Sequence, residues 1–169
     1  MQTPIHLLNG VAALTNVGLI RVQGDDAAKF LHGQLTNDFV LLGPAEARLA
    51  GFCTSKGRLQ ASFIGFKLSP TDILLVCDLA LLPATLKRLS MFVLRAKARL
   101  SDASADFVLF GLAGQALQNA IELRAISAFP TWSRAYFDGV SLVSLHPADG
   151  VARALWVAPS GSPAPAGAV

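Results

Sequence analysis

Short runs of apolar residues recur along the chain, and most of them are bounded by glycine, proline or small polar residues. Runs of this length with such boundaries are typical of β-strands. The predicted strands cover residues 17–22, 47–53, 59–66, 72–77, 96–100, 107–110, 140–145 and 152–157. A short polar loop joins the second and third of these runs, which predicts a hairpin.

Three further segments carry apolar residues at helical spacing. Residues 27–35 follow two aspartates suited to a helix start, and Phe30 and Leu31 share one face. Residues 79–94 show the clearest helical pattern, and residues 115–123 follow a glycine turn. Because helices and strands are mixed and joined by short, hairpin-like connections, the sequence predicts an α+β fold with mixed or antiparallel sheets and flanking helices.

The composition is unusually apolar, which adds one expectation about surfaces. Hydrophobic residues make up 53% of the chain and charged residues only 15%, and the mean hydropathy is +0.50. Polar residues and glycines interrupt both long uncharged stretches, 1–20 and 107–121, so neither predicts a membrane-spanning helix. The apolar surplus instead predicts a surface that packs against another domain or subunit.

The chain ends in a segment of different composition. Residues 159–169 contain only proline, glycine, serine, alanine and valine, which predicts a linker or tail, whereas residues 1–158 are predicted to fold, with two lobes meeting near 101–106. The only cysteines, Cys53 and Cys77, lack paired spacing and favour neither a disulfide scaffold nor a zinc site. With no secretion signal, the expected location is the cytoplasm.

No group of residues stands out as a catalytic centre on spacing alone, and the three histidines lack metal-ligand spacing. A basic cluster lies at and beyond the end of the segment 79–94. It consists of Lys87, Arg88, Arg95, Lys97 and Arg99. A solvated helix end is its simplest interpretation, and a surface for anions or RNA is the alternative, although few aromatic residues accompany the cluster and nucleic acid is disfavoured.

Three blocks of sequence resemble a known family. Residues 21–39, RVQGDDAAKFLHGQLTNDF, resemble the N-terminal signature of the glycine-cleavage T-protein superfamily. Residues 50–59, AGFCTSKGRL, are similar to its next block, in the form typical of the YgfZ branch. Residues 109–117, LFGLAGQAL, resemble a later strand–glycine–helix block. The resemblance covers about residues 17–158 and indicates the N-terminal portion of such a protein.

The resemblance implies a folate-binding fold with a central channel and, for the YgfZ branch, a role in iron–sulfur cluster assembly or repair. It puts Thr36, Asn37 and Asp38 near the channel and makes Lys56 and Arg58 available for a folate carboxylate. A helix stop and turn is the alternative interpretation of the first three. The implied cofactor is tetrahydrofolate, and the implied partners are iron–sulfur client proteins and either a missing C-terminal half or a second copy of the chain.

Two departures from the family pattern bear on activity. The aminomethyltransferases carry an acidic pair where this chain has Ala61 and Ser62, so a carboxylate that holds or accepts a proton at the reacting nitrogen is missing. The Lys-Gly-Cys signature of the YgfZ branch is absent as well, and neither cysteine is expected to replace it. The sequence therefore favours a non-catalytic tetrahydrofolate-binding protein over an aminomethyltransferase or an anion- or RNA-binding interaction module.

Overall fold

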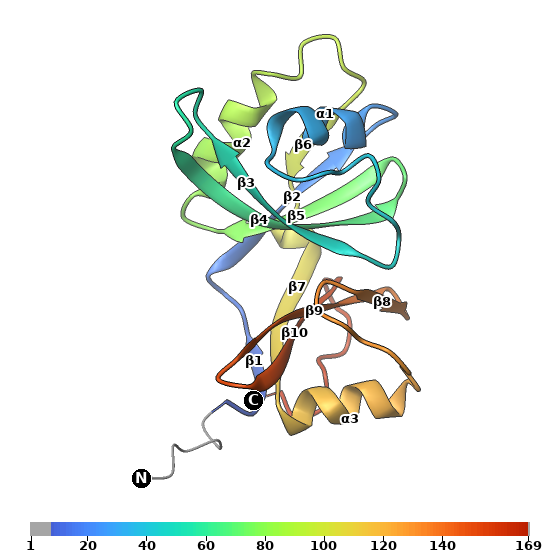
Figure 1. The fold of residues 1–169 in the computed structure, drawn as a ribbon. Coiled ribbons are helices and arrows are strands. Elements are labelled where there is room, and N and C mark those ends of the chain that lie inside the picture. Colours follow the sequence, from blue (N-terminus) through green and yellow to red (C-terminus); the bar gives the residue numbers. More distant parts are fainter. Residues whose placement is uncertain (1–7, 169) are drawn as a thin grey trace. The chain divides into compact units, whose positions relative to one another are not determined.

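The computed structural model describes residues 8–168, which divide into two compact units (Figure 1). One unit is continuous and spans residues 16–105, and the other combines residues 8–15 with residues 106–168. Each unit holds one five-stranded sheet, and neighbouring strands of both sheets run antiparallel. The predicted α+β class with antiparallel sheets is confirmed.

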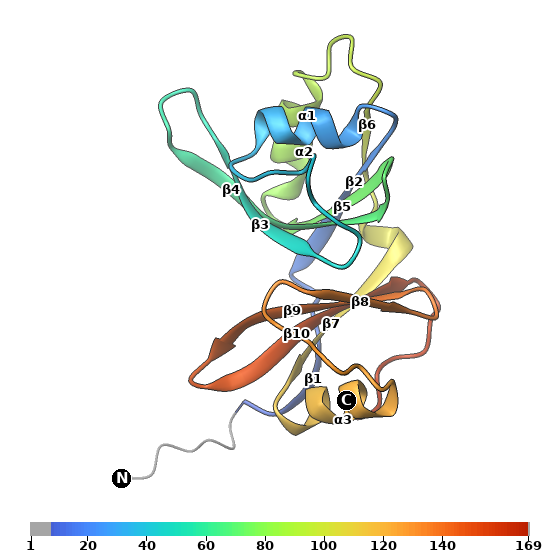
Figure 2. The same cartoon turned by 45° about the vertical axis from the view of Figure 1, so that its right-hand side comes forward.

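The sheet of the continuous unit has the strand order β3-β4-β5-β2-β6. Its strands are β2 (Val17–Gln23), β3 (Ala47–Cys53), β4 (Leu59–Ser69), β5 (Asp72–Asp78) and β6 (Arg99–Asp102). Two helices, α1 (Ala27–Gln34) and α2 (Leu82–Ser90), cover one face of this sheet (Figure 2). Because β3 is an edge strand, the N–H and C=O groups along one side of its backbone have no partner strand and can bond to another segment of the chain.

The core of the continuous unit lies between these helices and the sheet. Phe30 and Leu31 of α1 and Leu89 of α2 are buried in one cluster with strand residues such as Phe63. Each fully buried leucine or phenylalanine side chain contributes about 1.5–3 kcal/mol. Side chains alternate along β4, so Phe63 faces this core whereas the preceding Ser62 is exposed.

The discontinuous unit has the strand order β1-β7-β10-β9-β8 and one helix. Its elements are β1 (Gly10–Ala13), β7 (Phe107–Ala113), α3 (Gln115–Leu123), β8 (Arg134–Phe137), β9 (Val140–Ala148) and β10 (Val151–Pro159); a 3₁₀ turn, Ser104–Asp106, precedes β7. Leu117 of α3 packs in a cluster with Leu142 and Trp156 of the sheet. Beyond β10, Pro165 is buried and Ala168 forms a bridge with Val11.

The structure changes some of the element boundaries that the sequence predicts. The strand 47–53 and the helix 115–123 are confirmed with the predicted bounds. The helix predicted over 79–94 is shorter at both ends, since α2 spans Leu82–Ser90, and the strand predicted at 96–100 lies at Arg99–Asp102. Strands β1 and β8 were not predicted. No helix within residues 8–168 is long and apolar enough to cross a membrane.

The two cysteines differ in environment, which gives a first testable expectation. Cys77 is buried on β5, and this burial, with the nearby Asp78 and Asp102 carboxylates, raises the pKa of its thiol to about 11. Cys53 at the end of β3 is half-buried. Since the thiolate is the reactive form, a thiol reagent at pH 8 should label Cys53 readily and Cys77 only after unfolding.

Time-resolved labelling with a chromogenic disulfide reagent measures this difference. The Cys53→Ser variant should retain no fast-reacting thiol, and full labelling should return in denaturant. Two fast thiols in the folded wild-type chain would contradict the buried position of Cys77.

Candidate functional site

Residues 35–42 follow α1 on the way to β3 and carry three buried apolar side chains, with the polar residues 36–38 between the first two of them. Leu35, Phe39 and Leu42 are buried in the core of the continuous unit. They fix the segment at three points. The polar side chains between the first two anchors are therefore presented at the edge of the sheet.

Thr36 and Asn37 bind the open edge of β3. The Thr36 amide donates to the Gly51 carbonyl (3.0 Å), and the Gly51 amide donates to Thr36 Oγ1 (2.7 Å). Asn37 Nδ2 donates to the Leu49 carbonyl (3.0 Å). These bonds satisfy backbone groups that an edge strand otherwise leaves open. Both side chains thus position the segment against β3, as the alternative interpretation, a helix stop and turn, expects.

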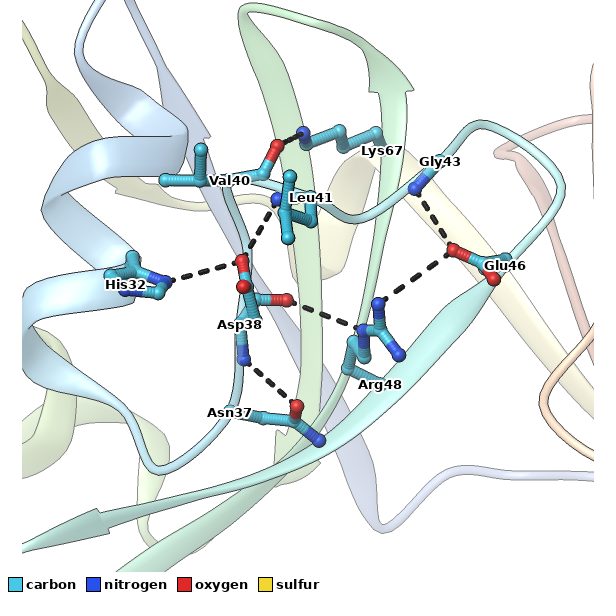
Figure 3. Close-up of polar contacts among 9 residues, drawn as sticks. All are labelled: His32, Asn37, Asp38, Val40, Leu41, Gly43, Glu46, Arg48 and Lys67. Carbon is cyan, nitrogen blue, oxygen red and sulfur yellow. Dashed lines mark hydrogen bonds and ion pairs between the residues drawn. The ribbon is translucent and has the colours of Figure 1, made fainter.

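Asp38 lies at the centre of a polar cluster (Figure 3). Its Oδ1 accepts from the Leu41 amide (2.8 Å) and lies 3.2 Å from Nδ1 of His32, while Arg48 Nε donates to its backbone carbonyl (3.3 Å). The Leu41 hydrogen bond is the main cause that lowers the pKa of Asp38. A carboxylate held in its ionised form accepts hydrogen bonds but has no proton to donate.

Further contacts fix the segment beyond Asp38 (Figure 3). Lys67 Nζ donates to the Val40 carbonyl at 3.5 Å; burial lowers the pKa of this lysine, and the Asp38 charge opposes the change. Glu46 accepts from the Gly43 amide (3.1 Å) and lies 3.7 Å from Nη2 of Arg48. The cluster therefore combines two carboxylates, Asp38 and Glu46, with the cations Arg48 and Lys67, and mainly holds the loop.

Lys56 and Arg58 lie at the tip of the β3–β4 hairpin. Backbone bonds close this tip: the Thr54 amide donates to the Arg58 carbonyl (2.8 Å), and the Gly57 amide donates to the Thr54 carbonyl (2.9 Å). Gly57 has a φ of +77°, a conformation that favours glycine. Both cationic side chains are exposed, and neither makes an ion pair or side-chain hydrogen bond with the residues that the structure describes. They remain available to an anion.

The structure separates the predicted site residues into two places along β3. Asp38 is tied to Arg48 near the start of the strand, whereas the cationic tip begins at Thr54 after its end. At 3.3 Å per residue these positions are about 20 Å apart. Thr36, beside Gly51, is the one of the three polar residues nearest to the tip.

Side chains that the sequence analysis did not select gather beside Thr36. Gly51 pairs with Ser62 across the hairpin, so both positions share one face of the sheet. A Cβ on Gly51 would lie 2.8 Å from Leu59 Cδ1 and 3.4 Å from Thr36 Oγ1, which places both side chains over this glycine. Leu49 and Leu59 are 53% and 64% exposed. We call Thr36, Leu49, Gly51, Leu59 and Ser62 the Gly51 surface; for Leu49, Gly51 and Leu59 the only sequence signal was a glycine inside a predicted strand.

Of the two positions that are acidic in aminomethyltransferases, only one reaches this surface. Ala61 is buried in the core and pairs with Phe52, whereas Ser62 is exposed beside Gly51. A hydroxyl at position 62 donates and accepts hydrogen bonds but does not titrate near neutral pH. Neither position provides a general acid or base to the Gly51 surface.

Several known proteins are similar in sequence to this chain. No protein-family model matches the chain. The tRNA-modifying protein YgfZ of Vibrio vulnificus is 31% identical over 111 residues, which are 66% of this chain and 33% of that protein. The mitochondrial iron–sulfur cluster assembly factor IBA57 of Mus musculus is 38% identical over 92 residues, 47% of this chain and 26% of that protein. Aminomethyltransferases match as well, one from Mycobacterium tuberculosis at 32% over 71 residues, 42% of this chain and 19% of that enzyme.

A solved structure shares the fold. The glycine cleavage system aminomethyltransferase T from Bartonella henselae aligns with a TM-score of 0.74 and 18% identity, over 89% of this chain and 42% of that protein. The chain spans about a third of the length of the first curated relatives it matches, 36% and 33%. The relatives and the shared fold show that this chain belongs to the glycine-cleavage T-protein superfamily, and its partial coverage fits an N-terminal portion of such a protein.

Proposed function

We propose that this chain forms part of a tetrahydrofolate site in a YgfZ-like protein that supports iron–sulfur cluster assembly or repair without catalysing aminomethyl transfer. The observation that carries the proposal is the β3–β4 hairpin with the adjoining Thr36, which together combine an apolar surface, the hydroxyl groups of Thr36 and Ser62 and unpaired cations but no carboxylate at position 61 or 62. The names of the YgfZ and IBA57 relatives support the process, since one of them is an iron–sulfur cluster assembly factor.

The chemistry of the hairpin fits a reduced folate. Tetrahydrofolate joins a partly apolar ring system to a glutamate tail. Leu49 and Leu59 offer apolar contact for the rings, and the Thr36 hydroxyl, whose oxygen already accepts from Gly51, keeps its own hydrogen to donate. Lys56 or Arg58 would pair with a carboxylate of the tail. Bound tetrahydrofolate would supply an amine that carries one-carbon units, while these residues bind and orient it.

The aminomethyltransferase relatives make that activity the second candidate. The enzyme would need a carboxylate at the amine to hold or accept a proton. Ala61 is enclosed in the core, and Ser62 carries only a hydroxyl. Release of ammonia from an aminomethylated carrier protein above background, dependent on tetrahydrofolate, would favour the enzyme and reject a non-catalytic role.

A folate titration tests the proposed site. Because the chain spans about a third of the first relatives' length, we expect weak binding of tetrahydrofolate to it alone, with amide shifts in two-dimensional NMR spectra at Thr36, Gly51 and the hairpin tip. Lys56→Glu replaces attraction to a carboxylate by repulsion and should weaken binding about threefold to tenfold. Lys29→Glu makes the same exposed charge change on α1 and should leave binding unchanged.

Different outcomes bear on the two parts of the proposal. Shifts confined to other segments, or equal affinity of the Lys56→Glu variant, would reject the hairpin as the folate site. The iron–sulfur role is measured separately, as the activity of an iron–sulfur enzyme in cells that lack their own YgfZ protein and carry this chain. Activity no higher than with an empty vector would reject that role for the chain.

A further inference from the structure

The segment that follows α2 exposes large apolar side chains instead of burying them. Residues 91–98, here called the α2 loop, connect α2 to β6 (Figure 1). In this loop Met91 is 68% exposed, Phe92 44% and Leu94 88%. Soluble monomers seldom gather such side chains at one place unless the surface binds something.

The backbone at Leu94 makes this exposure more informative. The Ala96 amide donates to the Val93 carbonyl (2.8 Å), which closes a tight turn with Leu94 at its second position. Leu94 has a φ of +46°, a region that favours glycine, asparagine or aspartate in turns. A leucine there costs about 1–2 kcal/mol. Because its side chain is almost fully exposed, no burial within the chain offsets this cost.

Unpaired positive charge surrounds these apolar side chains. No acidic residue occurs between Asp78 and Asp102 in the sequence. The nearby Asp26 carboxylate accepts from the Lys97 amide (2.8 Å) and so holds the loop backbone. The exposed basic residues of α2, the loop and β6 make no ion pair with the part of the chain that the structure describes: Lys87, Arg88, Arg95, Lys97 and Arg99. Such a surface attracts an acidic partner.

A groove adjoins the loop and is lined by residues of α2 and by Gln60 of β4. It has a volume of about 450 Å³, and Met91 belongs to both the loop and the groove. Leu81 and Ala84 give the groove an apolar part, and Lys87 and Arg88 give it a cationic part. A depression of this kind accepts the side chains of a bound segment.

From these features we propose that the α2 loop and the α2 groove bind an acidic segment of another protein that carries apolar anchor residues. Leu94, Met91 and Phe92 supply the apolar contact, and the basic residues pair with carboxylates at the rim. Methionine, phenylalanine and arginine are enriched in protein interfaces. Protein surfaces that bind RNA stack the bases on several aromatic rings, whereas the α2 loop has only one aromatic residue, Phe92, which disfavours RNA as the partner. A membrane is disfavoured as the partner because it offers no peptide segment whose side chains could enter the groove.

The test uses the full chain and defined probes. The first probe is a synthetic peptide of glutamate and leucine; the comparison probes are a glutamate and glycine peptide of equal charge, bulk tRNA, and vesicles of phosphatidylcholine with phosphatidylglycerol. We expect only the first peptide to bind, with amide shifts across residues 87–99 and an affinity that falls with salt. Leu94→Asn should weaken binding at least about fivefold.

The Leu94→Asn variant separates binding from folding. Asparagine tolerates a positive φ, so the thermal midpoint should stay equal or rise while peptide affinity falls. Leu123→Asn removes another exposed leucine, 77% accessible on α3, and should not change peptide binding. Equal affinity of wild type and Leu94→Asn, equal binding of both peptides, no binding of either, or tighter binding of tRNA or vesicles would each overturn the proposal.

Discussion

Replacing Phe39 with alanine is expected to lower the free energy of unfolding by about 3–5 kcal/mol. Phe39 is fully buried in the core of the continuous unit. Its ring lies against the backbone of Gly65 on β4, where an added Cβ would come within 2.6 Å of Cε1. The deletion removes the buried ring and leaves a cavity that a rigid sheet cannot fill, so urea denaturation should show a lower midpoint with a similar slope.

The Phe39→Ala substitution should also loosen the candidate site. Phe39 follows Asp38 directly and is the central anchor of the segment 35–42, so its loss should speed hydrogen exchange at the Thr36 and Leu41 amides. Val40→Ala is the matched control, because Val40 is the next residue and is 51% exposed. A similar loss of stability in both variants would contradict the anchoring role of Phe39.

The helices and strands that could be predicted from sequence are those whose apolar pattern ends at residues that also stop the element. The strand 47–53 and the helix 115–123 are of this kind, and the structure gives them the predicted bounds. The helix prediction over 79–94 was too long because its apolar residues continue into Met91, Phe92 and Leu94, which the structure exposes rather than buries. Apolar periodicity cannot distinguish a buried helix face from a surface that binds a partner.

The two strands that the sequence analysis missed lack a local strand pattern for different reasons. β1 pairs with β7, nearly a hundred residues later, and the uncharged stretch around β1 lacks alternation. β8 is four residues long and begins at Arg134, a buried cation that donates to Ser141 Oγ (3.0 Å). Arginine is rarely buried, so sequence reasoning takes such a residue as exposed.

The candidate site shows the same division. The polar residues Thr36, Asn37 and Asp38 could be selected because they stop a helix and match a family signature. The Gly51 surface could not, since the register of β3 against β4 brings Ser62 opposite Gly51, and a bulge beside Cys53 carries Leu59 over the glycine. Register shifts of this kind follow from tertiary packing rather than from local pattern.

Replacing Gly24 with alanine is expected to destabilise the continuous unit by at least about 3 kcal/mol, since a positive φ and a backbone clash act together. Gly24 lies between β2 and α1 with a φ of +133°, and a Cβ there would lie 2.1 Å from the Lys97 carbonyl oxygen. Its amide donates to the Thr71 carbonyl (2.9 Å), and its carbonyl accepts from Ala27 (3.1 Å). Gly24 therefore cannot move away from Lys97 without breaking its bonds to Thr71 and Ala27.

The clash should also release the α2 loop. Lys97 is held by two bonds to Asp26, one from the Asp26 amide to its carbonyl (3.0 Å) and one from its own amide to the Asp26 carboxylate. Displacing the Lys97 carbonyl breaks the first bond, so amide exchange across residues 91–97 should become faster than in wild type.

Gly33→Ala is the matched control for Gly24→Ala. Gly33 lies within α1, and an added Cβ there meets no atom within 4 Å. Alanine should therefore raise the free energy of unfolding by about 0.5–1 kcal/mol, because glycine loses more conformational entropy in a helix. Urea denaturation of both variants measures the difference. If Gly24→Ala unfolds at the wild-type midpoint, the close approach of Gly24 to Lys97 of the α2 loop is wrong.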